Sequence, residues 1–228
     1  MIAEIRTGKK QTQSKVFIVD DHPIVRQGLK LLINQEPDLT VCGEAESADA
    51  VLPAIRELKP AIAVIDLSLG HDSGIELIKN IKLQHPDLPI LVLSMHDESL
   101  YAERALRAGA RGYIMKQAAP EKVIIAIRQV LQGAIYVSDA MKAKMLNKII
   151  DSRREGSSSP VELLSDRELQ VFKLLGSGLS TRQVSEQLHV SIKTVEAYRA
   201  NIKEKLKFKS SAELVQHAIH WVLSGDLP

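Results

Sequence analysis

The chain has 228 residues, of which 45% are hydrophobic, and its 30 basic side chains nearly balance 28 acidic ones. This length predicts two small domains, and the net charge of +2 argues neither for nor against a polyanionic partner. The single cysteine excludes an intrachain disulfide. No apolar run approaches the ~20 residues of a membrane span, and residues 1–14 lack the apolar core of a signal peptide. We therefore expect a cytoplasmic protein with no membrane partner and a flexible N-terminal segment over residues 1–14.

Residues 15–133 alternate between short apolar runs and helical patterns. The strand-like runs fall at 15–19, 40–45, 61–66, 89–93 and 112–115. The helical patterns between them fall at 24–35, 48–58, 74–84, 99–108 and 120–132. Five successive β-then-α units predict an α/β domain with a doubly wound, flavodoxin-like sheet of five parallel strands. This fold alone does not define a function.

Carboxylates follow two of the predicted strands. Asp20 and Asp21 come after Val16–Val19, and Asp66 comes after Ala61–Ile65. In an open α/β sheet, ligands bind at the carboxyl ends of the strands. Three carboxylates in one crevice repel one another unless a cation neutralises them. The sequence therefore predicts a divalent-metal site beside a reactive aspartate.

Two further polar side chains end strands at the same predicted edge, Ser94 after the fourth strand and Lys116 after the fifth. Acids, a hydroxyl and an ammonium suit a phosphoryl group, with Asp66 as nucleophile and Ser94 and Lys116 as hydrogen-bond donors. Each residue alone has an ordinary explanation, because an acid at a strand end is often a helix cap and a rim lysine is usually solvated. Their joint placement at one edge favours phosphoryl chemistry.

The order and separation of these five residues resemble the receiver domain of two-component response regulators. Further matches are His22-Pro23, Gly74, Ala108-Gly109-Ala110 and Tyr113, and the resemblance covers residues 15–133. It implies that Asp66 accepts phosphate from a sensor histidine kinase and that Ser94 and Tyr113 shift together on phosphorylation. It also implies that Mg²⁺ is held by Asp20, Asp21, Asp66 and the backbone carbonyl of Ser68. Gln117 stands where many receivers carry proline, so a cis peptide after Lys116 would cost more.

Residues 134–160 are the predicted connection between two domains. Residues 134–150 keep a helical pattern, with Met141, Met145, Leu146 and Ile149 at near-helical spacing. Residues 151–160 read as a flexible polar linker. The helix could form a packing or dimer surface, or it could cover the edge of the first core, and the sequence leaves both interpretations open.

Residues 161–228 show no strand pattern and predict a small all-α domain. Ser165 and Glu168 form a capping box that opens a helix ending at Gly176, and Ser180 and Gln183 cap a short helix at 181–188. A tight connection leads to a third helix at 192–206, which predicts a helix-turn-helix whose last helix enters a major groove. A final helix at 211–223 carries two apolar stripes. One stripe could pack on the domain while the other pairs with a second copy; burial of both is the alternative.

Positive charge is concentrated on the third of these helices. Between residues 193 and 209, six basic side chains stand against two acidic ones, a net charge of +4 that leaves −2 for the rest of the chain. A charged helix face is usually only a solvated face. Combined with the helix-turn-helix spacing, however, this concentration favours contact with DNA phosphates.

The same residues resemble the LuxR-type DNA-binding domain. The matching segments are Leu164–Glu168, Gly178–Ser180, Val190–Ser191, Thr194–Glu196 and Lys205–Leu206. A receiver joined to such a domain defines the NarL/FixJ class of response regulators. The resemblance implies that Glu196, Ala197 and Ala200 read bases. It implies backbone contacts, which position the protein without specifying sequence, for Thr181, Lys193, Thr194, Arg199, Asn201 and Lys203.

We interpret the chain as a phosphorylation-controlled transcriptional regulator and not an enzyme. Its expected partners are a sensor histidine kinase, double-stranded promoter DNA, a second copy when phosphorylated and, as a further candidate, RNA polymerase. One alternative is a constitutive DNA-binding protein whose receiver serves only for dimerisation. Another is an aspartate-nucleophile phosphohydrolase, but such enzymes usually carry a second acid two residues after the nucleophile, where this chain has Ser68.

Overall fold

The computed structural model describes residues 13–69, 72–151 and 160–224. The chain divides into two compact units, Met1–Met141 (the first unit) and Lys142–Pro228 (the second unit). Most of the predicted flexible segment 1–14 and most of the predicted linker 151–160 lie outside the described residues. The domain boundaries inferred from the sequence, 15–133, 134–160 and 161–228, stay a prediction.

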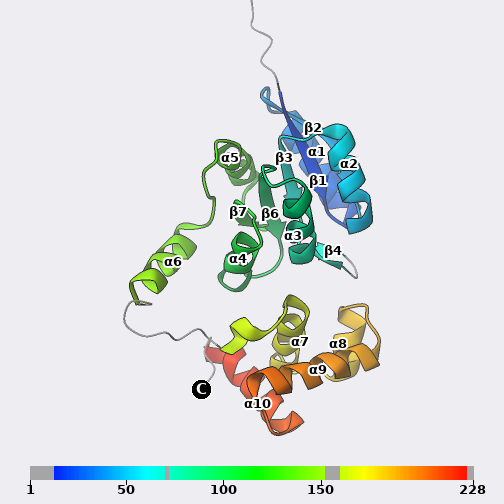
Figure 1. The fold of residues 1–228 in the computed structure, drawn as a ribbon, viewed down its shortest axis with the longest axis vertical. Helices are drawn as coiled ribbons and strands as arrows, with labels where there is room; N and C mark the ends of the chain where they lie inside the picture. The colour runs from blue at the N-terminus through cyan, green and yellow to red at the C-terminus, as the bar shows by residue number, and fades with distance from the viewer. Residues whose placement is uncertain (1–12, 70–71, 152–159, 225–228) are drawn as a thin grey trace, which may run out of the picture. The chain divides into compact units, whose positions relative to one another are not determined.

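A parallel sheet of five strands forms the centre of the first unit, in the order β2-β1-β3-β6-β7 (Figure 1). β1 pairs with both β2 and β3, so the chain changes its direction of winding between β1 and β3. This order confirms the predicted doubly wound sheet and marks the β1–β3 crevice as the place for a ligand. The strands are β1 Ser14–Val19, β2 Leu39–Ala45, β3 Ile62–Ile65, β6 Ile90–Ser94 and β7 Gly112–Met115.

Helices cover both faces of this sheet (Figure 1). Strand residues such as Val16, Val64 and Leu93 share one apolar core with helices α1 and α5. Because side chains alternate along a strand, neighbours such as Phe17 and Val92, which are fully buried, face the helices on the other side. The helices are α1 Pro23–Asn34, α2 Val51–Leu58, α3 Gly74–Gln84, α4 Glu98–Arg107 and α5 Pro120–Leu131, with a short 3₁₀ turn, η1, at Ala48–Ala50.

Two features of the first unit were not predicted from the sequence. After Asp66, the short strands β4 (Ser68–Leu69) and β5 (Asp72–Ser73) pair antiparallel. After α5, the chain returns to the sheet: Tyr113 N–H donates to the Tyr136 carbonyl (2.8 Å), and Tyr136 N–H donates to the Arg111 carbonyl (3.0 Å). The segment after residue 133 therefore pairs with β7.

The predicted Met-rich helix is α6, Asp139–Asp151. Met141 is only 4% exposed, which supports the interpretation that this helix begins by covering the edge of the first core. Leu146 is 61% exposed, and the side chain of Ile149 lies outside the described part of the chain. The helix therefore carries one apolar residue that is buried, Met141, and one that is exposed to solvent, Leu146. Across residues 13–69, 72–151 and 160–224, no helix has the length and apolar character needed to cross a bilayer.

The described residues of the second unit form helices joined by turns, with no strand, as predicted for residues 161–228. Both capping boxes form, Ser165 with Glu168 and Ser180 with Gln183. The rings of Phe172 and Trp221 lie 5.6 Å apart in its core. A Cβ on Gly176 would lie 2.3 Å from the Ala218 carbonyl oxygen, so only glycine allows this close approach of α7 and α10. The elements are η2 Pro160–Leu163, α7 Asp166–Gly176, α8 Thr181–Gln187, α9 Ile192–Leu206 and α10 Ser211–Ser224.

The last helix resolves the question of its two apolar stripes. Leu214, Ala218 and Trp221 are buried in the second unit. On the other stripe, Ile219 is 40% exposed and Val222 is 38% exposed. The two stripes of α10 are therefore not both buried within one chain.

A partly buried ion pair joins α7 to α9. The Lys205 ammonium lies 2.6 Å from Oε2 of Glu168, whose side chain is 4% exposed, and Ser165 N–H donates to the same oxygen (2.7 Å). We expect Lys205→Met to lower the free energy of unfolding of this unit by about 1 kcal/mol, because the half-exposed ammonium is partly screened. Urea unfolding followed by Trp221, the only tryptophan, measures it, with the exposed Lys207→Met as matched control.

The pH dependence of this loss has a defined sign. Burial favours a higher pKa for Glu168, but the hydrogen bonds from Lys205 and Ser165 outweigh burial and hold the pKa below its ordinary value of 4.5. A depressed folded pKa contributes stability above the unfolded value, and that stability is lost as pH falls through the folded value. The difference between wild type and Lys205→Met should therefore be full at neutral pH and shrink below about pH 4. A difference that is independent of pH would contradict this assignment.

Candidate phosphoryl-acceptor site and DNA-binding helix

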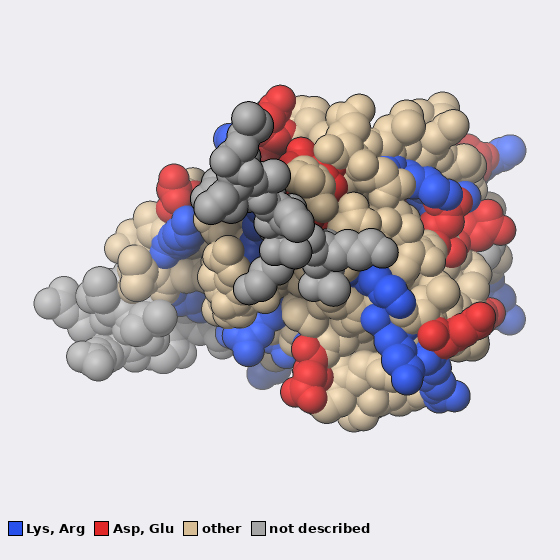
Figure 2. Space-filling model, turned by 90° about the horizontal axis from the view of Figure 1, so that it is seen from above, with Lys and Arg blue, Asp and Glu red and all other residues tan. Residues whose placement is uncertain are grey.

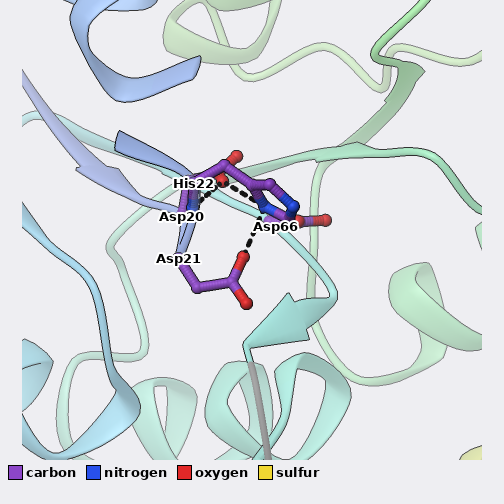
Figure 3. A group of neighbouring side chains, drawn as sticks. All are labelled: Asp20, Asp21, His22 and Asp66. Carbon is purple, nitrogen blue, oxygen red and sulfur yellow. Dashed lines mark hydrogen bonds and ion pairs between the residues drawn. The ribbon is translucent and has the colours of Figure 1, made fainter. Parts of the chain in front are cut away.

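The pairing of β1 with β3 brings Asp20 beside Asp66. Val19 lies opposite Ile65 in the sheet, and Asp66 N–H donates to the Val19 carbonyl (2.8 Å). Each aspartate follows the last residue of its strand, so both side chains reach the same crevice. Asp20 is 1% exposed and Asp66 is 2% exposed. The structure thus places these predicted site residues together (Figure 3).

Lys116 joins the two buried aspartates. Its ammonium lies 2.6 Å from Asp20 Oδ2 and 2.7 Å from Asp66 Oδ2. Burial would lower the pKa of Lys116, but its hydrogen bonds to both carboxylates outweigh burial and raise that pKa. Burial raises the pKa of Asp66, and the hydrogen bond from Lys116 opposes that change. Among the described residues every peptide bond is trans, so Gln117 follows Lys116 in the trans form.

The crevice has the ligand groups of a divalent-cation site. Asp66 Oδ1 is buried and has no hydrogen-bond partner, which is costly for a carboxylate oxygen unless another group meets it. Asp20, Asp21, His22 and Asp66 each offer one ligand atom, and these atoms all lie within 4.8 Å of one another. Carboxylate oxygens are the ligands that Mg²⁺ prefers. The residues present therefore fit the cation that the sequence predicted.

Ser94 and Tyr113 lie in the same buried region, linked through His96. Tyr113 O–H donates to the His96 carbonyl (2.8 Å), and His96 N–H donates to Ser94 Oγ (3.2 Å). Burial raises the pKa of Tyr113, so its hydroxyl remains a donor. The His96 ring stacks on Tyr101 with centroids 4.6 Å apart, and His96 Nε2 lies 3.0 Å from Ser68 Oγ. The place of His96 in this network could not be predicted from the sequence, because contacts between loops leave no periodic pattern.

Ser68 occupies the position where a phosphohydrolase would carry its second acid. Its side chain is a hydroxyl in contact with His96 Nε2 (3.0 Å), and a hydroxyl lacks the acid–base chemistry of a carboxylate. The role of its backbone carbonyl as a metal ligand stays a prediction.

The predicted base readers share the exposed face of α9. Glu196, Ala197 and Ala200 are exposed, while Val195 and Ile202 on the opposite face are fully buried. This division gives a helix anchored by one side and free to present the other side to a groove.

The residues predicted to contact the DNA backbone flank that face. Arg199 donates to the Thr181 hydroxyl and so links α9 to the first residue of α8. Thr194 N–H donates to Ser191 Oγ (3.0 Å), so Ser191 caps α9. Of the remaining candidates, Lys193 and Asn201 are exposed and Lys203 is partly buried. The hydroxyls of Thr181 and Thr194 are thus already engaged within the unit.

Charge is mixed on other parts of the surface. On the face that Figure 2 shows, Lys and Arg side chains are interspersed with Asp and Glu side chains. Neither sign dominates that face, in contrast to the net charge of +4 over residues 193–209.

A doubly wound sheet with an acidic crevice, followed by a helix-turn-helix, defines a response regulator. The family model of the response regulator receiver domain matches residues 16–128, and that of the bacterial regulatory proteins of the luxR family matches residues 162–218. The chain belongs to the LuxR-family response regulators, which are phosphorylation-controlled, DNA-binding regulators of transcription.

Individual relatives agree with this assignment. The oxygen regulatory protein NreC of Staphylococcus epidermidis is 35% identical over 210 residues, which cover 90% of this chain and 96% of the relative. RcsB of Salmonella enterica serovar Typhimurium, solved bound to promoter rprA with the phosphomimetic BeF3⁻, is 28% identical with a TM-score of 0.58 and covers 90% of this chain and 98% of its own. A LuxR-family response regulator of Aurantimonas is 34% identical with a TM-score of 0.57, over 61% of this chain and 99% of its own.

Proposed function

We propose that Asp66 is the phosphoryl acceptor of this regulator and that its phosphorylation by a sensor histidine kinase controls the binding of α9 to promoter DNA. The observation that carries this proposal is the state of the Asp66 carboxylate. It is buried beside Asp20, one oxygen contacts the Lys116 ammonium at 2.7 Å, and the other has no partner. A carboxylate held in this way is oriented for attack on phosphorus.

The transfer assigns a role to each group in the crevice. An Asp66 oxygen forms a bond to phosphorus while the bond from phosphorus to the kinase histidine breaks, and the histidine nitrogen keeps that electron pair. Mg²⁺, when held by Asp20, Asp21, Asp66 and the Ser68 carbonyl, supplies positive charge to the phosphoryl oxygens. Lys116 donates to one of those oxygens and exchanges its contact with Asp66 Oδ2 for the new one.

The switch runs from Ser94 to the β6–α4 loop. When the Ser94 hydroxyl turns to a phosphoryl oxygen, the hydrogen bond that it accepts from His96 changes, and His96 also holds Tyr113. A change at Ser94 is thereby coupled to the position of Tyr113 and to the start of α4. This coupling supports the proposal that phosphorylation repositions Tyr113 and frees the DNA-binding unit.

On DNA, we place Glu196, Ala197 and Ala200 against base edges and the flanking residues of α9 against phosphates. One RcsB structure contains two dimers bound to DNA, and we propose that this chain also binds paired half-sites as a phosphorylated homodimer. The exposed Ile219 and Val222 of α10 are available for pairing with a second copy. We also propose RNA polymerase as a further candidate partner and the cytoplasm as the location of the protein.

The test combines a small phosphodonor with removal of the metal. We expect acetyl phosphate and Mg²⁺ to add one phosphoryl group per chain, to convert monomer to dimer in light scattering, and to raise DNA affinity at least about tenfold. The duplex is one selected from fragmented genomic DNA by its retention on the phosphorylated protein. Excess EDTA should abolish all three changes, because the carboxylates then lack their cation.

One outcome would favour the constitutive alternative. If the chain takes up phosphate but its mass and DNA affinity stay the same, the receiver serves only as a scaffold. The complete set of acids, lysine and hydroxyl in the crevice argues against that reading.

A further inference from the structure

His22 lies at the mouth of the acidic crevice. Its Nδ1 is 2.6 Å from Asp21 Oδ1 and 3.4 Å from Asp20 Oδ1, and Figure 3 shows the imidazole ring beside the carboxylates. The His22 side chain is 63% exposed. A ring nitrogen therefore stands at the same place as the oxygens that would hold the cation.

The backbone of His22 fixes this position. His22 N–H donates to Asp20 Oδ1 (2.9 Å), and its carbonyl accepts from Val25 and Arg26 at the start of α1. Although His22 is the N-cap residue of α1, its side chain makes no capping hydrogen bond. The imidazole is thus directed to the carboxylates and takes no part in the cap.

The spacing of the group suits one ion. Metal–ligand bonds of about 2.0–2.6 Å place two ligands on opposite sides of an ion about 4–5.2 Å apart. The ligand atoms of Asp20, Asp21, His22 and Asp66 all fall within 4.8 Å of one another. Lys116 contacts Oδ2 of Asp20 and Asp66, which leaves the unpartnered Asp66 Oδ1 available to an ion.

We propose that His22 supplies an imidazole nitrogen to this cation. Imidazole is a ligand for first-row transition metals, whereas Mg²⁺ prefers oxygen and keeps its waters. A site of carboxylates with one imidazole therefore binds divalent transition ions such as Mn²⁺ with an advantage over Mg²⁺ that depends on His22. This inference rests on the metal site of the proposed function but not on phosphoryl transfer.

The direct test is pulsed electron paramagnetic resonance of bound Mn²⁺. Wild type should show echo modulation from a coordinated ¹⁴N, and incorporation of ¹⁵N-labelled histidine should shift that modulation to the ¹⁵N frequency. His22→Ala should lack it. The matched control is His220→Ala, which removes an exposed histidine of α10 and should behave as wild type. Absence of nitrogen modulation in wild type, or its persistence in His22→Ala, would overturn the proposal.

Affinity gives a second readout that a merely structural role would not reproduce. Titration of the free Mn²⁺ signal should show a loss of about tenfold in His22→Ala, while Mg²⁺ affinity by calorimetry changes less than about threefold. Equal losses for both ions would mean that His22 only orients Asp21, and would overturn metal ligation.

The same preparations separate this inference from the proposed function. Wild-type phosphoryl uptake with Mg²⁺, together with absent nitrogen modulation, overturns the role of His22 and leaves Asp66 as acceptor. Nitrogen modulation without any phosphoryl uptake supports the role of His22 and overturns the proposed function.

Discussion

Asp66→Asn is expected to abolish phosphoryl uptake from acetyl phosphate in the presence of Mg²⁺, by a factor of at least about 10³. Asparagine keeps the shape of the side chain but replaces the nucleophilic, metal-binding carboxylate with an amide. The hydrogen bond from Lys116 can persist to the amide oxygen, so the crevice should keep its fold. Intact-mass spectrometry measures the uptake, and light scattering and DNA retention measure its consequences.

The matched control for this change is Asp87→Asn. Asp87 is an exposed aspartate before β6, at the end of the sheet opposite the crevice. Asp87→Asn removes the same charge, and this variant should take up phosphate at the wild-type rate. Phosphoryl uptake by Asp66→Asn would place the acceptor elsewhere. Dimerisation and DNA binding by Asp66→Asn equal to those of the phosphorylated wild type would refute control by this residue.

Ala200→Glu is expected to reduce the affinity of the phosphorylated protein for its selected duplex about 100-fold. Ala200 lies on the exposed face of α9, where we place it against a base edge. A glutamate there loses an apolar contact and sets a negative charge near the DNA phosphates. Because the side chain points away from the core, the free energy of unfolding should stay within about 0.5 kcal/mol of the wild-type value.

The control adds the same charge away from the proposed interface. Ala212 is exposed in the first turn of α10, where an acidic residue is electrostatically favourable. Ala212→Glu should keep DNA affinity within about threefold of wild type. Equal losses in the two variants would show that total charge, and not contact through α9, governs binding. No loss in Ala200→Glu would remove Ala200 from the interface.

Much of the fold could be predicted because its signals are local. A buried parallel strand is a continuous apolar run, so Val16–Val19 and Ala61–Ile65 mark β1 and β3 and place Asp20 and Asp66 just beyond them. The capping boxes at Ser165 and Ser180 are equally local, since both partners lie within one helical turn. These short-range patterns were sufficient to predict the crevice and the helix-turn-helix.

The remaining features depend on contacts between segments far apart in sequence. Ser68 and His96 are separated by 28 positions, and Glu168 and Lys205 by 37. The sequence separation of neither pair indicates a contact, because each contact forms only when two loops or two helices pack together. The role of His22 was hidden for a different reason. It stands next to Asp21 in a recognisable sequence pattern, but only the turn into α1 determines where its ring lies.

The return of the chain to β7 after α5 has a consequence for the integrity of the sheet. β7 is an edge strand, and exposed edges invite pairing with other chains. Tyr136 covers part of that edge by bonding the backbone on both sides of Gly112, while Val137 and Met141 are buried. A fragment that ends at Gly133 would lose this cover and expose the unpaired edge of β7 to other chains. The first residues after Gly133 therefore also protect the sheet against aggregation.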